Sequence, residues 1–178
     1  SHLMTDSTFW AKDYYGVKPG KKLYNCVTVP ALNATESVLS ALYDISLTLQ
    51  KKKRTYILCH AMAQYFELKS LYPKADNILL IYNAKSLLEF YSHVDFLVSC
   101  RLHGSIPALS LGINVMNIAM DSRSSAFDMF GFKSLPYTSL KKRDQNLTFN
   151  RVPVAQHPSA TRFILTFKKY IMGGNLEI

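Results

Sequence analysis

Cysteine is scarce in this chain, with three residues among 178. Cys26, Cys59 and Cys100 are odd in number and have no regular spacing, which argues against a disulfide framework and favours a reducing compartment. No second pair of Cys or His occurs at the spacing of zinc ligands, so we expect no metal site. Stability then has to come from an ordinary core, for which 48% hydrophobic residues are typical.

Long apolar runs and acidic residues are also scarce. No run approaches the roughly 18 residues of a membrane span, and no signal-peptide pattern opens the chain. Asp and Glu number 12 against 21 Lys and Arg, which gives a formal net charge of +9. No zinc-finger spacing, aromatic RNA-binding motif or basic recognition helix accompanies this charge, so we expect no nucleic-acid partner. We expect a cytoplasmic protein, including the cytoplasmic face of a membrane as a location.

Short apolar strands alternate with amphipathic helices from residue 23 onward. The predicted strands are 23–29, 55–59, 78–82, 94–99 and 115–119, with 135–140 as one more candidate. The predicted helices are 34–50, 62–72, 85–93, 105–111, 125–130 and 160–171. Strands that are apolar on both faces and alternate with helices indicate a parallel sheet covered on both sides. The sequence predicts an α/β, Rossmann-like three-layer domain with about five or six parallel strands.

Composition changes along the chain suggest four parts. Residues 1–4 look like a cloning remnant, and residues 5–22 lack periodicity and are interpreted as an extended connector. Residues 23–132 hold the regular α/β pattern. Residues 133–178 combine a polar loop with an apolar stripe that predicts a terminal helix packed on the same domain.

The stretch 94–124, VDFLVSCRLHGSIPALSLGINVMNIAMDSRS, carries most of the functional information. An apolar strand ends in Arg101-Leu102-His103-Gly104, and a helix of small residues follows. Ligands of open α/β sheets bind at the carboxyl ends of strands, and a helix N-terminus there favours anions. Arg101 offers a fork of donors for carboxylate or phosphate, and His103 is a residue type that exchanges protons near neutral pH. This pattern predicts chemistry on a small anionic substrate.

The same residues, D-x-x-V-S-x-R-L-H-G-x-I-P-A-L-x-L-G-I followed by a strand and D-S-R-S, resemble the signature of the polysaccharide pyruvyltransferases. The resemblance implies the second half of a two-domain fold like that of GT-B glycosyltransferases. It also implies transfer of the pyruvyl group of phosphoenolpyruvate, as donor substrate, onto a saccharide as a ketal, with no other cofactor. Arg101 would then bind the donor carboxylate or phosphate, and His103 would be the general acid. Leu102 would point into the core.

Further residues are candidates for the donor site. The backbone amides of Gly104 and Ser105, at the expected helix start, could cradle an anion. Arg123, with Ser122 or Asp121 orienting it, follows the next strand and is a candidate second cation; pairing with Asp121 alone is an equally weighted alternative. His60 ends another strand and could line the same cleft.

The chain departs from the family pattern at one position. Related enzymes place an arginine just beyond the first strand of this domain, whereas residues 29–33 of this chain hold no cation. Arg123, Lys21 and Lys22, or a missing N-terminal domain could supply the charge, or the activity could be altered. Two other functions remain open: a GT-B-type glycosyltransferase domain that binds a nucleotide sugar, and a degenerate, non-catalytic domain. The expected partners are phosphoenolpyruvate, a saccharide acceptor and that other domain, with a homo-oligomer left open.

Overall fold

A computed structural model describes residues 11–31, 34–121, 134–136 and 138. Helices and strands alternate along the chain. The strands are β1 (Tyr24–Thr28), β2 (Thr55–Cys59), β3 (Ile78–Leu80), β4 (Val94–Ser99), β5 (Asn114–Ala119) and β6 (Leu135–Pro136). The helices are α1 (Ala11–Tyr14), α2 (Glu36–Gln50), α3 (Met62–Leu71), α4 (Ala84–Ser92) and α5 (Leu102–Ser110).

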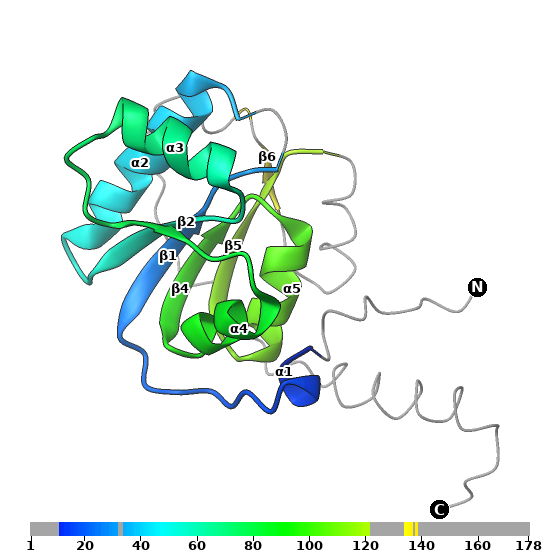
Figure 1. Ribbon diagram of the computed structural model, residues 1–178. Coiled ribbons are helices and arrows are strands. Elements are labelled where there is room, and N and C mark those ends of the chain that lie inside the picture. Colours follow the sequence, from blue (N-terminus) through cyan, green and yellow to red (C-terminus); the bar gives the residue numbers. More distant parts are fainter. Residues whose placement is uncertain (1–10, 32–33, 122–133, 137, 139–178) are drawn as a thin grey trace, which may run out of the picture.

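The strands form one parallel sheet in the order β3-β2-β1-β4-β5-β6. The chain builds outward from β1 to β3, returns to place β4 beside β1, and then builds outward in the other direction (Figure 1). This is the strand order of a doubly wound, nucleotide-binding type of sheet. The predicted α/β, Rossmann-like architecture is confirmed, and the point where the strand order reverses lies between β1 and β4.

Helices cover both faces of the sheet. Neighbouring residues of a strand face opposite ways, so the central strands bury side chains on both faces. Cys26 packs with residues of α4 and α5, whereas the next residue, Val27, packs with residues of α2. Both side chains are fully buried. All three cysteines are free and buried. Burial raises the pKa of the Cys100 thiol to about 12, so it is protonated at neutral pH.

Two local predictions were wrong. Residues 5–22 were expected to be extended, but Ala11–Tyr14 form α1, and Ala11 and Val17 pack against the core cluster of α4 and α5. That this stretch connects to another domain stays a prediction. Helix α5 begins at Leu102 instead of Ser105, because extended backbone at Arg101 lets its carbonyl accept the first helical hydrogen bonds. Pro107 consequently lies inside the helix and not in its first turn.

Several expectations concern residues outside the described part of the chain. These are the helices at 125–130 and 160–171 and the candidate site residues Ser122 and Arg123. None of the helices in the described residues has the length and apolar character needed to cross a membrane.

Candidate functional site

Arg101 lies where the strand order reverses. It follows β4, and its Nε donates to the carbonyl of Val29, one residue beyond β1, at 2.9 Å. The side chain therefore bridges the carboxyl ends of the two strands that flank the reversal. In open α/β sheets, the crevice beyond these two strand ends is the usual ligand site.

Buried hydroxyl groups hold the backbone of Arg101 in place. The Ser99 hydroxyl accepts from the Arg101 amide at 3.1 Å and donates to the Arg101 carbonyl at 2.9 Å. Thr28, at the end of β1, accepts from the amide of Cys100 at 3.1 Å. Ser99 and Thr28 are completely buried. These two positioning residues were not predicted, although a hydroxyl at the end of each apolar strand is a signal that could have found them.

The guanidinium of Arg101 is half-buried, and burial lowers the pKa of the group from its usual value. It remains a cation at neutral pH because an arginine is not deprotonated in proteins. No acidic side chain of the described residues forms an ion pair with it. Asp95 lies at the other end of β4 and pairs with Lys53 at 2.6 Å. The Nη groups are therefore suited to an external anion.

His103 is the second residue of α5, and its side chain is exposed. It thus lies in the same helical turn that begins from Arg101, at a helix N-terminus whose dipole favours negative charge. Leu102, between the two, packs against the core cluster of α4 and α5, as predicted. The sequence R-L-H therefore alternates a half-buried cation, a core anchor and an exposed imidazole.

The backbone amides of Gly104 and Ser105 do not form the expected anion cradle. Both backbone amides donate to the Arg101 carbonyl, at 3.1 and 2.9 Å, because the helix begins three residues earlier than predicted. Ser105 is completely buried, and its hydroxyl lies 2.9 Å from Asn117 Oδ1 and 3.0 Å from the Arg101 carbonyl. Both residues thus have a packing and positioning role in the start of α5.

Glycine at position 104 also has a steric role, which was not predicted from the sequence. A Cβ atom at this position would lie 3.3 Å from the Tyr91 hydroxyl and 3.3 Å from Ser99 Oγ. These are closer than ordinary contacts, so glycine permits α5 to approach α4 and the end of β4. The buried Tyr91 hydroxyl has no hydrogen-bond partner among the described residues.

His60 follows β2, on the other side of β1 from Arg101. Gln64, a buried residue of α3, accepts from the His60 amide at 3.1 Å and donates to the Pro30 carbonyl at 2.8 Å. The side-chain amide of Gln64 therefore links the chain segments that leave β1 and β2. Gln64 was not predicted, because a single glutamine in a helix carries no visible signal.

The imidazole of His60 is neutral at neutral pH. Burial, and secondarily the charge of Arg101, lower the pKa of this group to about 4, while a hydrogen bond with the Ile81 backbone opposes them. Its Nε2 is buried and has no hydrogen-bond partner among the described residues. Sequence reasoning placed His60 and Arg101 at one edge of the sheet, and the structure brings them close enough to interact electrostatically.

We expect His60 to make stability pH-dependent. Its pKa is about 4 in the folded protein and about 6.5 in the unfolded chain, so the unfolded state binds more protons between these values. Stability should therefore fall as the pH drops from about 6.5 to about 4, by up to about 3 kcal/mol for this residue. Urea unfolding of the wild type and of His60→Gln across this range isolates the contribution. Equal pH slopes for the two proteins would contradict the assignment.

The second cation is not supplied by Lys21 or Lys22. Both precede β1, and Lys22 Nζ donates to the Ser92 carbonyl before β4, at the edge of the sheet opposite to Arg101. Arg123 and Ser122, which lie outside the described residues, remain predictions. Within the described residues, no group of three His, Cys, Asp or Glu side chains gathers where it could hold a metal ion.

The family model for polysaccharide pyruvyl transferases matches residues 1–122, which include the strand reversal, Arg101 and His103. The chain belongs to this family. The resemblance first seen in the R-L-H stretch is thereby confirmed, whereas the roles of individual site residues stay predictions. No curated protein matches the chain significantly.

Two solved structures resemble this family member in fold. One is a protein from Listeria monocytogenes assigned as a UDP-N-acetylglucosamine 2-epimerase, with a TM-score of 0.54 at 12% identity. The other is S. aureus MnaA in complex with UDP, with a TM-score of 0.54 at 14% identity. Each comparison covers 98% of this chain and about half of the other protein, 50% and 51% respectively. At these identities the likeness shows the fold alone, and this chain corresponds to about half of a GT-B-type fold.

Proposed function

We propose that this chain binds phosphoenolpyruvate at the carboxyl ends of β1 and β4 and is the donor-binding half of an enzyme that transfers pyruvyl to a saccharide. The observation that carries the proposal is Arg101, a half-buried guanidinium at the strand reversal that forms no ion pair with a described acidic residue. Membership in the pyruvyl transferase family supports the reaction class.

The chemistry needs an anion site and a proton donor. Ketal formation adds one proton to the methylene carbon of phosphoenolpyruvate, bonds two saccharide oxygens to the adjacent carbon, and releases phosphate. The two hydroxyl groups give up two protons, of which one returns to the acid and one leaves with phosphate. One acid that is recharged in each cycle is therefore sufficient.

Arg101 and His103 fit these two tasks. With Nε fixed on the Val29 carbonyl, the Nη groups of Arg101 offer parallel donors to the donor's carboxylate or phosphate. His103, exposed in the first turn of α5, would protonate the methylene carbon, since an imidazole suits proton transfer near neutral pH. Its place at a helix N-terminus near an anionic donor favours a phosphate close to the ring.

His60 is proposed to border the donor from the β2 side. A neutral imidazole adds no charge, so it would contribute shape and one hydrogen bond rather than a second cation. The second cation would come from Arg123, with Ser122 beside it, or from another domain, which we also propose to bind the acceptor. The chain spans only about half of each of the two similar structures.

Two titrations test the proposal. Calorimetry of this chain with phosphoenolpyruvate should show binding, and the same titration with UDP-N-acetylglucosamine should not. A protein containing both halves should release phosphate from phosphoenolpyruvate only when a saccharide acceptor is present. Binding of the nucleotide sugar alone would favour the glycosyltransferase alternative, and binding of neither ligand would favour a non-catalytic domain.

A further inference from the structure

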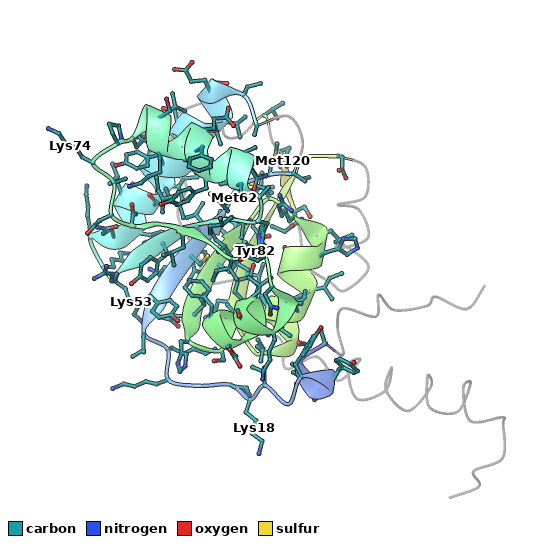
Figure 2. All side chains as sticks on the ribbon, in the orientation of Figure 1. Lys18, Lys53, Met62, Lys74, Tyr82 and Met120 are labelled. Carbon is teal, nitrogen blue, oxygen red and sulfur yellow. The ribbon has the colours of Figure 1, made fainter. Side chains whose placement is uncertain are left out.

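The edge of the sheet opposite to Arg101 is strongly basic. Two loops, residues 15–23 and 51–54, lie there, because they lead into the neighbouring strands β1 and β2. Together they contain seven basic residues and no acidic one. We call residues 15–23 and 51–54 the basic edge. Figure 2 shows Lys18 projecting below the molecule and Lys53 on its left side.

Hydrogen bonds hold the two loops together and against the sheet. Lys53 Nζ donates to the Lys22 carbonyl at 3.4 Å and to Asp95 at 2.6 Å. The Gly20 amide donates to the Ser92 carbonyl at 3.0 Å, and the His93 ring lies 3.1 Å from the Lys21 carbonyl. A Cβ atom at Gly20 would lie 2.7 Å from the His93 ring, so a larger residue there would have to displace the ring. The loops are thus rigidly presented.

The outer lysines of the basic edge have their charges free for a partner. Lys18, Lys21, Lys51 and Lys52 are exposed, and none of them forms an ion pair with a described residue. Arg54 contacts the Tyr56 ring at 5.1 Å, and only Lys53 is neutralised, by Asp95. A surface of this kind attracts anionic partners.

Large apolar side chains accompany these charges. Leu23 is 47% exposed within the basic edge, and Tyr14, just before it, is 84% exposed and forms an edge-to-face pair with Tyr15 at 4.9 Å. Gly16, with a φ of 68°, ends α1 and turns the chain from these tyrosines into the loop that carries Lys18. Figure 1 shows α1 and the following loop along one side of the molecule.

We propose that the basic edge, with Tyr14, docks this protein onto a membrane surface rich in anionic phospholipids. Each lysine near such a surface strengthens binding by about fivefold, and tyrosines prefer the headgroup region. A soluble inorganic polyanion would use the lysines but would gain little from an exposed tyrosine and leucine. Docked in this way, the carboxyl ends of β1 and β4 face away from the membrane and stay open to substrate.

Co-sedimentation with phosphatidylcholine vesicles, with and without phosphatidylserine, tests this surface. We expect binding only when phosphatidylserine is present. The double variant Lys51→Gln/Lys52→Gln should bind at least about tenfold more weakly, as the loss of two lysine contributions implies. The single variant Lys52→Gln should also bind more weakly. The control Lys85→Gln makes the same change in net charge at an exposed lysine at the start of α4, at the edge of the sheet that holds Arg101, and should bind like the wild type.

The variant Tyr14→Ser distinguishes binding to a membrane from binding to a soluble polyanion. It should weaken binding to the phosphatidylserine vesicles and leave binding to inorganic polyphosphate unchanged. The proposal is overturned if the vesicles are not bound, if Lys52→Gln and Lys85→Gln lose binding equally, or if Tyr14→Ser has no effect. These measurements need no phosphoenolpyruvate, so their outcome is independent of the proposed function.

Discussion

Arg101→Ala is expected to abolish measurable binding of phosphoenolpyruvate, with a loss of at least about 100-fold in affinity. The substitution removes a charge-assisted, bidentate donor from a partly desolvated site, where such a group is worth about 3 kcal/mol or more. It also releases the Val29 carbonyl from its 2.9 Å hydrogen bond. Calorimetric titration of the chain with phosphoenolpyruvate measures the effect.

Two further substitutions of arginine make this test specific. Arg54→Ala removes the same type of side chain at the opposite edge of the sheet and should leave binding of phosphoenolpyruvate unchanged. Arg101→Lys keeps the charge but lacks both the Nε anchor and the fork, so we expect affinity between those of Ala and Arg. If Arg101→Ala binds the donor like the wild type, the site at the strand reversal is not the donor site.

The order of helices and strands could be predicted because each element buries a continuous apolar pattern. The strands at 55–59 and 94–99 have the predicted bounds, since polar or small residues flank a short β-branched and apolar run. The edge strand β3 is shorter than expected and ends at Leu80. Its pairing with a single neighbour, β2, gives the last residues of the apolar run no second partner to extend the ladder.

The beginning of α5 could not be predicted from residue types alone. Ser105 and Pro107 together are typical of a helix start, with serine as cap and proline in the first turn. The actual start depends on Ser99, whose hydroxyl bonds to both the amide and the carbonyl of Arg101 and fixes its extended conformation. Such a contact between a strand end and a helix start is tertiary, so no local pattern reveals it.

The sequence pattern predicted that the candidate residues Arg101 and His60 lie at one edge of the sheet, but it did not predict the contacts that they make there. Parallel strands bring Arg101 and His60 to the same edge, as the sequence pattern indicated. The strand order, which determines that β1 lies between the two residues, follows only from the pairing of β1 with both β2 and β4. The link made by Gln64 and the bond from Arg101 to Val29 both depend on that order.

His103→Gln should separate donor binding from turnover. Glutamine keeps a polar side chain of similar reach but does not transfer protons, so we expect affinity for phosphoenolpyruvate to change by less than about threefold. Phosphate release by a protein containing both halves should fall by about 100-fold to 10,000-fold, the usual range for the loss of a general acid. The two quantities are measured by calorimetry and by a phosphate-release assay with saccharide present.

His93→Gln is the matched control for the general acid, because it removes an imidazole at the opposite edge, where the ring contacts the Lys21 carbonyl. Turnover of that variant should equal that of the wild type. If His103→Gln turns over normally, His103 is not the acid, and another group has to protonate the methylene carbon. If instead its affinity and its turnover fall by the same factor, the imidazole acts in donor binding, because a group needed only for proton transfer lowers the rate of the bound complex without weakening the complex itself.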